Sequence, residues 1–167
     1  QYTPSAGTTD PLILVGVGGA GIDVLGGVLH RLHDRFGAAE NWPTVEFLAL
    51  DSNARPNSAR FREEDLERVQ TVPIPLKSAE SYSERAGDYL KWIGRRWLYN
   101  IARDLTTSGY RPLGRLALMS HAVRVREAIQ SAVSQAVTRA GTADCTPRVL
   151  LIGSICGGTA SGTLFDL

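Results

Sequence analysis

The chain has 167 residues, of which 43% are hydrophobic and 21% are charged, and its formal net charge is +1. This balance is typical of a single globular domain, and the nearly neutral charge argues against nucleic acid as a partner. The apolar runs are broken by glycine and too short to cross a membrane, and no signal peptide opens the chain, so we expect a cytoplasmic protein. The only cysteines, Cys145 and Cys156, show no CxxC spacing, which argues against a disulfide framework or a zinc site.

The N-terminal part of the chain has the pattern of a strand, a glycine-rich turn and a helix. Residues 1–11 are polar and rich in Thr, Pro and Gly, and we expect a flexible lead-in there. The apolar run at 12–16 predicts a strand that is covered on both faces, and the turn GVGGAG follows it at 16–21. A helix ending near Phe36 is then predicted by apolar residues at helical spacing, namely Ile22, Leu25, Val28, Leu29 and Leu32.

Strands and helices continue to alternate along the chain. The second strand ends at Asp51, and a second glycine-rich turn, CGGTASG, occupies 156–162. The remaining predicted elements are a strand over 45–50, a shorter strand over 71–74, a long helix over 113–140 and a strand over 148–155.

The segment 84–104 has its own apolar stripe. Leu90, Ile93, Trp97 and Ile101 recur at helical spacing, which predicts one amphipathic helix with Arg95 and Arg96 on its solvent side. Core packing is the simplest role for this stripe, and a partner-binding face is the alternative.

The order of these elements predicts the fold class. Strands alternating with helices favour an open, mostly parallel sheet with helices on both faces, a Rossmann-like α/β fold. In such sheets ligands bind beyond the carboxyl ends of the strands. Both glycine-rich turns follow predicted strands, so both belong to that edge.

The turns have the chemistry of anion sites. A glycine turn before a helix directs backbone N–H groups at an anion, and phosphate is its natural occupant. Gly16, Gly18 and Gly21 fit the GxGxxG pattern of dinucleotide sites, with Asp51 as a ribose-binding acid. However, Asp51 follows Gly21 by more than the usual ~20 residues, neither turn contains GK[ST], and a second turn is superfluous for a dinucleotide. Two turns at one crevice favour a nucleoside triphosphate instead.

Four segments, taken in order, resemble the tubulin and FtsZ superfamily. GVGGAG resembles its first phosphate loop, DSNA after the second strand resembles the FtsZ segment NTDA, and CGGTASG resembles the signature GGGTGSG. SGYRPLGRLAL is similar to the segment facing the γ-phosphate, and particularly resembles bacterial tubulin-like proteins outside the cell-division branch. Relative to FtsZ, residues 75–108 look like a helical insertion. Cys156 and Ala160 depart from the signature, since each replaces a glycine.

The resemblance implies a site for GTP or GDP with Mg²⁺. The first turn would cradle the α- and β-phosphates, and the second would wrap the phosphate tail from the other side. Asp23 would face the nucleoside, Asp51 and Asn53 would orient Mg²⁺ through its waters, and Arg115 or Arg111 would supply charge near the γ-phosphate. The expected contact residues are Gly18, Gly19, Ala20, Gly21, Asp23, Asp51, Ser52, Asn53, Gly114, Arg115, Gly157, Gly158, Thr159, Ala160, Ser161 and Gly162.

The resemblance also implies GTP hydrolysis coupled to head-to-tail assembly of a homopolymer. In the superfamily a later helix holds the base, and acidic residues on a further loop complete hydrolysis in the next subunit. We expect both segments to lie beyond Leu167, so no catalytic residue is assigned. This chain alone is then expected to bind GTP weakly or not at all, with negligible hydrolysis.

Two alternatives stay open at this point. One is an NAD(P)-binding module of an oxidoreductase that uses Gly16, Gly18, Gly21 and Asp51. The other is a structural tubulin relative that keeps the fold without hydrolysing nucleotide.

Overall fold

The computed structural model describes residues 10–53, 61, 65–141 and 145–167. Residues 1–9 of the expected lead-in, and Ala54 of the DSNA segment, therefore lie outside the described residues.

Four strands form one sheet in the order β3-β2-β1-β4, and every pairing is parallel. Leu12 of β1 pairs with Val45 of β2 on one side and with Arg148 of β4 on the other. The predicted open parallel sheet is confirmed, and its third strand begins two residues earlier than the sequence indicates. The strands are β1 (Leu12–Val17), β2 (Val45–Asp51), β3 (Val69–Pro73) and β4 (Arg148–Gly153).

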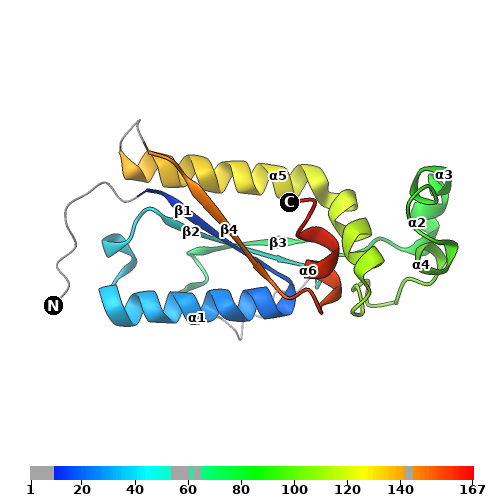
Figure 1. Ribbon diagram of the computed structural model, residues 1–167, viewed down its shortest axis with the longest axis horizontal. Helices are drawn as coiled ribbons and strands as arrows, with labels where there is room; N and C mark the ends of the chain where they lie inside the picture. Colours follow the sequence, from blue (N-terminus) through cyan, green and yellow to red (C-terminus); the bar gives the residue numbers. More distant parts are fainter. Residues whose placement is uncertain (1–9, 54–60, 62–64, 142–144) are drawn as a thin grey trace.

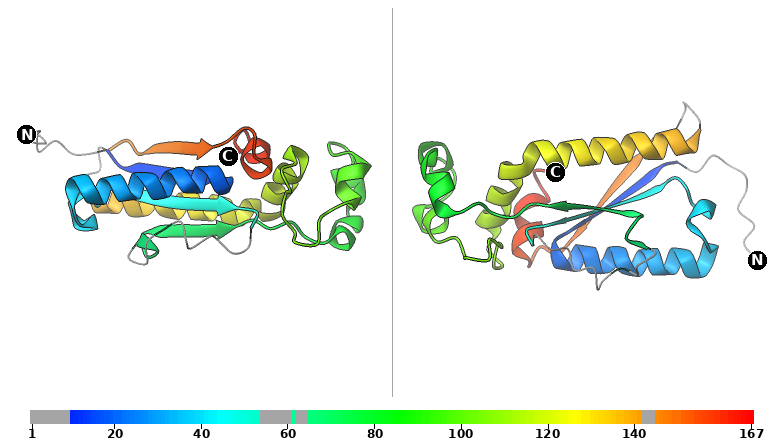
Figure 2. Two further views of the ribbon diagram at one scale, coloured as in Figure 1. Left: turned by 90° about the horizontal axis from the view of Figure 1, so that it is seen from below. Right: turned by 180° about the vertical axis from the view of Figure 1, so that it is seen from behind.

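Two long helices cover the opposite faces of this sheet (Figures 1 and 2). Helix α1 (Gly18–Phe36) packs Ile22, Leu25 and Leu29 against one face. Helix α5 (Arg111–Ala140) packs the other face with a row of small and branched residues that includes Val125 and Ala132. The central strands β1 and β2 are buried along nearly their whole length, which explains why they appear in the sequence as continuous apolar runs rather than as alternating patterns. In contrast, Val149 and Leu150 of β4 are exposed.

Helix α5 is kinked at His121, where φ is −125° and ψ is 15°. The ring Nε2 of His121 lies 2.8 Å from the carbonyl oxygen of Pro75. Burial holds the pKa of His121 below its ordinary value, although the bond to Pro75 opposes this shift. The kink sets the first turns of α5 apart from the part that covers the sheet.

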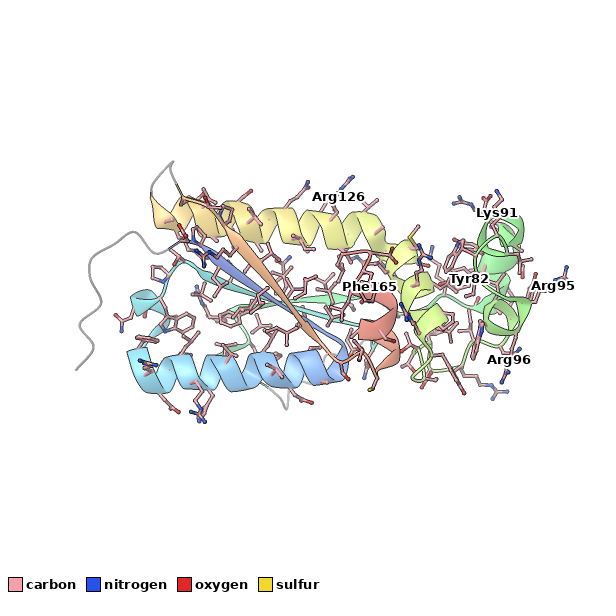
Figure 3. The ribbon with its side chains drawn as sticks, in the orientation of Figure 1. Tyr82, Lys91, Arg95, Arg96, Arg126 and Phe165 are labelled. Carbon is pink, nitrogen blue, oxygen red and sulfur yellow. The ribbon has the colours of Figure 1, made fainter. Side chains whose placement is uncertain are left out.

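A third apolar cluster lies beyond the end of the sheet, on the first turns of α5 (Figure 1). Its centre is Tyr82, which is fully buried and whose hydroxyl lies 2.9 Å from Ser120 Oγ. Figure 3 shows Tyr82 among these side chains, while Arg95 and Arg96 point outward as predicted.

The prediction of one helix over 84–104 is wrong. The region contains short helices instead, because Gly94 is extended, with ψ of 148°, and caps a new helix there. Ile93 of the predicted stripe is buried in the bend before Gly94, and Leu98, which the predicted stripe does not include, is buried on the helix that follows. The short elements of the chain are η1 (Ala39–Asn41), α2 (Ala79–Ser83), α3 (Ala86–Tyr89), α4 (Arg95–Tyr99) and α6 (Gly158–Thr163).

Within the described residues, no helix combines the length and the apolar character needed to cross a membrane.

Candidate functional site

The strand order reverses at β1, since β2 and β3 lie on one side of it and β4 lies on the other. In parallel α/β sheets such a switch point opens a crevice beyond the carboxyl ends of the strands. The turns that follow β1 and β4 meet there, as the sequence predicts, and share a hollow of about 80 Å³. The hollow is lined by Val17, Gly18, Gly19, Ala20, Ser154, Gly157, Gly158, Thr159 and Ala160.

The first turn is also the start of α1. Gly18 is the first residue of this 19-residue helix and has a φ of 67°, which few residues other than glycine adopt. The first turn of α1 contains no acidic residue and no side-chain cap. The positive end of the helix dipole is therefore directed at the hollow with no carboxylate from the first turn of the helix to neutralise it.

Gly21 has a different role in the same turn. A Cβ on Gly21 would overlap the carbonyl oxygen of Ile152 in β4. The missing side chain lets α1 lie close against β4, which is the packing role of the third glycine in GxGxxG turns. Gly21 does not line the hollow.

The second turn leads into α6, which packs against the start of α5 almost backbone to backbone. A Cβ on Gly114 would overlap the carbonyl oxygen of Gly158, and one on Gly162 would overlap that of Arg111. A Cβ on Gly158 would lie 2.6 Å from the carbonyl carbon of Gly109. Close helix packing thus explains three glycines for which the sequence suggested phosphate contacts.

A buried group of hydroxyls, which we call the hydroxyl cluster, joins β2 to α6. It consists of Ser52, Thr107 and Thr159, each less than 7% exposed, being 4%, 4% and 6%. Ser52 Oγ lies 2.9 Å and Thr107 Oγ1 lies 3.2 Å from Thr159 Oγ1. Thr159 Oγ1 also lies 3.4 Å from a carboxylate oxygen of Asp51. The cluster therefore connects the tip of β2 with a residue that lines the hollow.

Thr107 is the member of this cluster that sequence reasoning missed. It comes directly before the SGYRPLGRLAL segment, in the polar run Thr106-Thr107-Ser108. The available signal was a run of hydroxyl residues beside the SGYRPLGRLAL segment. Its contact partners are distant in the sequence, so nothing local pointed to its burial.

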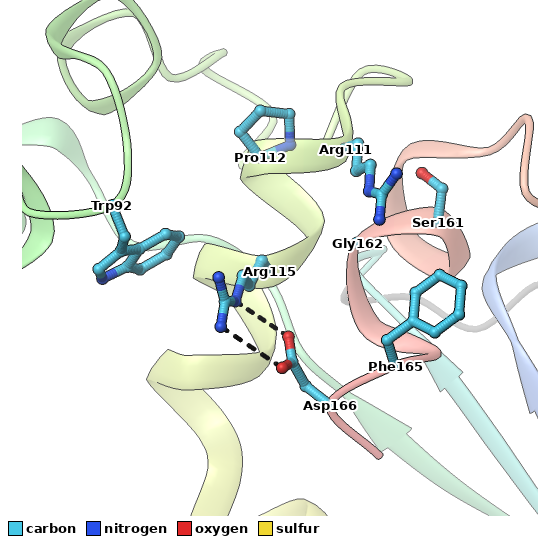
Figure 4. A pocket seen from close by; sticks show the side chains of 8 residues that line it. All are labelled: Trp92, Arg111, Pro112, Arg115, Ser161, Gly162, Phe165 and Asp166. Carbon is cyan, nitrogen blue, oxygen red and sulfur yellow. Dashed lines mark hydrogen bonds and ion pairs between the residues drawn. The ribbon is translucent and has the colours of Figure 1, made fainter.

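Other predicted residues lie elsewhere. Asp23 and Asn53 are exposed and do not line the hollow. Arg115, Ser161 and Gly162 line a separate pocket of about 360 Å³ (Figure 4). There the Nε of Arg115 donates to Asp166 Oδ2 at 3.0 Å, and its guanidinium lies 5.1 Å from the Trp92 ring centroid. The remaining lining residues of this pocket are Arg111, Pro112 and Phe165.

The two departures from the signature are accommodated differently. Cys156 is exposed and does not line the hollow, and its N–H donates to Ser154 Oγ at 3.2 Å. Ala160 is 2% exposed and packs into the core cluster between the sheet and α5. Ala160 also lines the hollow.

The donor set near the hollow fits Mg²⁺ only in part. Among the described residues, no three His, Cys, Asp or Glu side chains gather to hold a metal. Mg²⁺ usually needs only one or two carboxylates, because phosphate oxygens and waters supply the rest of its ligands. Asp51 is half-buried at the end of β2 and can serve as that carboxylate.

The parallel sheet, the helices on both faces and the hollow at the switch point define an open, Rossmann-like α/β domain. A family model described as tubulin-like matches residues 13–167. The chain belongs to this tubulin-like family, which confirms the resemblance seen in its sequence. No curated protein and no solved structure matches the chain at a significant level.

Proposed function

We propose that the hollow between the two glycine-rich turns holds the phosphates of GTP. The observation that carries this proposal is that both turns line one hollow at the start of α1, whose first turn has no acidic residue. Backbone N–H groups and the positive end of a long helix favour a phosphate at such a place. Thr159 lines the opposite wall, and its hydroxyl is bound within the hydroxyl cluster.

The size of the hollow decides which part of the nucleotide it holds. Complete small-molecule sites usually have volumes of roughly 300–1,000 Å³, whereas this hollow has about 80 Å³. It therefore suits a phosphate group rather than a whole nucleoside. For these 167 residues we expect weak affinity for GTP and negligible turnover, since little surface is left for the base.

Asp51 is the residue that we propose for Mg²⁺. Its carboxylate lies beside Thr159 at the edge of the hollow. A bound Mg²⁺ would neutralise charge on the phosphate oxygens. Asn53 follows on the same connection, and we propose that it orients waters of the ion.

Membership of the tubulin-like family supports a wider proposal about the whole protein. We propose that it hydrolyses GTP, assembles head to tail with copies of itself, and works in the cytoplasm, the compartment that supplies nucleoside triphosphates. An oxidoreductase module that binds NAD(P) is the competing function. NAD(P) binding needs only the first glycine-rich turn. The presence of the second turn at the same hollow therefore favours a nucleoside triphosphate over a dinucleotide.

Titration followed by amide NMR tests the site itself. Inorganic triphosphate with Mg²⁺ is the first probe because it needs no base contact. We expect triphosphate to change the amide chemical shifts of residues 18–20 and 157–160, with a dissociation constant on the order of 1 mM. Shifts caused by NAD but not by triphosphate would support the dinucleotide alternative, and no shifts with GTP, NAD or triphosphate would support the structural relative.

A matched pair of variants on α1 sharpens this test. Ala20→Glu puts a carboxylate into the first turn of the helix, beside the hollow, where it suits the helix dipole but repels phosphate. We expect triphosphate binding to fall at least tenfold with no loss of thermal stability. Val24→Glu adds the same charge at an exposed position further along α1 and should change binding by less than about twofold. Equal effects of the two variants would show that the helix start does not form the site.

A further inference from the structure

Thr107 lies in the connection between α4 and α5, outside both glycine-rich turns, yet it is tied to both sides of the candidate site. Its hydroxyl lies 3.2 Å from Thr159 Oγ1, and its backbone N–H donates to Ser52 Oγ at 3.5 Å. Its carbonyl oxygen accepts the N–H of Tyr110 at 2.8 Å. One residue thus joins β2, α6 and the start of α5.

The hydrogen bonds of the hydroxyl cluster converge on Thr159 and Asp51. Thr159 Oγ1 is close to three oxygen atoms, from Ser52, Thr107 and Asp51, but its hydroxyl can donate only one proton. Ser52 Oγ lies 3.5 Å from the same carboxylate oxygen of Asp51, so either Ser52 or Thr159 can donate to it. In both arrangements the Thr107 hydroxyl bonds to Thr159 Oγ1 and helps to fix the rotamer of a side chain that lines the hollow.

The backbone around Thr107 is held in an unfavourable form. Leu105 has a φ of 56° and Ser108 has a φ of 47°, and both are left-handed conformations that non-glycine residues seldom adopt. Such conformations persist where surrounding contacts over-determine them. Thr107 lies between these two residues and makes the buried contacts that hold the segment. Gly158 presses against it, because a Cβ there would lie 2.7 Å from Thr107 Oγ1.

We infer that Thr107 is a positioning residue of the phosphate site: its hydroxyl holds Thr159, and with it the first turn of α6, in the geometry that faces the hollow. This inference rests on the proposed function for its role in binding. The contact itself is independent of any ligand.

The test compares variants at position 107 in the whole chain. Thr107→Val keeps the shape and loses the hydroxyl, while Thr107→Ser keeps the hydroxyl and loses a methyl group. Thr107→Ala differs from Thr107→Ser by the hydroxyl alone. If Thr107→Val does not fold, the comparison of these two variants still shows whether the hydroxyl is needed. Thr106→Val is the matched control, because the Thr106 hydroxyl bonds to Asp104 at 3.0 Å on the exposed side.

Two measurements are made on each variant. The first is affinity for inorganic triphosphate, where losing the hydroxyl should weaken binding roughly five- to tenfold, the worth of one hydrogen bond. The second is hydrogen exchange of the Ser161 amide, which donates to Gly157 in the first turn of α6. We expect faster exchange in the valine and alanine variants, and wild-type values of both quantities in the serine and Thr106→Val variants.

The outcomes separate the two proposals. If the wild-type chain binds no triphosphate at the two turns, the proposed function fails, and the exchange data alone decide whether Thr107 positions α6. If the wild type binds but serine weakens binding as much as alanine does, the methyl group matters rather than the hydroxyl and the inference is overturned. Unchanged binding and exchange in Thr107→Val also overturn it.

Discussion

The two glycine-rich turns look alike in sequence but use their glycines differently. In the first turn, Gly18 gives the backbone the positive φ that starts α1 beside the hollow, and Gly21 lets the helix lie on β4. In the second turn, Gly158 and Gly162 let α6 lie on the start of α5. Glycines in such a motif can therefore serve close packing between two backbone segments as well as close contact between the backbone and a ligand. The second wall of the hollow depends on α5 for its position.

The largest effect should come from filling the contact between α5 and α6. Gly114→Ala and Gly162→Ala each place a methyl group against a carbonyl oxygen that belongs to a helix backbone and cannot easily move. We expect each to lower the free energy of unfolding by about 3 kcal/mol, measured by urea denaturation. Gly27→Ala is the control, because no atom lies within 4 Å of its added Cβ, and it should stabilise the chain by up to about 1 kcal/mol. Similar results for all three would mean that the helices are not packed this closely.

An intermediate effect should come from the glycines that face the hollow. Gly18→Ala has space for its Cβ, whose nearest neighbour is 3.4 Å away, but it must keep a positive φ. We expect a loss of about 1 kcal/mol in unfolding free energy. Gly157→Ala has neither problem, since its φ is −89° and the nearest atom is 3.6 Å away, so its stability should change by less than about 0.5 kcal/mol. Both should weaken triphosphate binding, and wild-type affinity in both variants would remove these residues from the site.

The smallest effect concerns His121, which lies at the kink of α5. The first turns of α5, which pack against α6, precede this kink. Burial lowers the pKa of His121 in the folded chain, so the unfolded chain takes up its proton at a higher pH. Stability should therefore fall as the pH drops below the ordinary histidine pKa, about 6.5, and level off once the folded form is also protonated. His121→Gln should flatten this slope in urea denaturation between pH 5 and 8. An unaltered slope in His121→Gln would assign the pH dependence to other groups.

The sequence predicts the sheet and its two long helices because these elements satisfy their apolar patterns locally. The runs at β1 and β2 are buried along nearly their whole length, and the period of α1 matches the face that it packs. The meeting of the two turns follows from the parallel direction of the strands alone. Composition and spacing therefore carry most of the fold and the place of the candidate site.

The predictions that failed have two physical causes, which are a local break of the helix at Gly94 and contacts between residues distant in the sequence. The apolar stripe of 84–104 is real, but Gly94 interrupts the helix and the chain folds around Tyr82 instead. The packing role of Gly162 depends on Arg111, and the burial of Thr107 depends on Ser52 and Thr159. No periodicity encodes such pairs, because each partner lies in a different element.

The pairing of β1 with β4 has a consequence for the order of folding. Strand β1 cannot pair with β4 until residues 148–153 are available. The entropy of closing the very long loop between the two strands opposes this pairing. During synthesis on a ribosome, β1, α1 and β2 can assemble while β4 has yet to emerge. The hollow is then the last feature to mature, and a chain trapped before that step would keep both of its long helices while lacking the hollow.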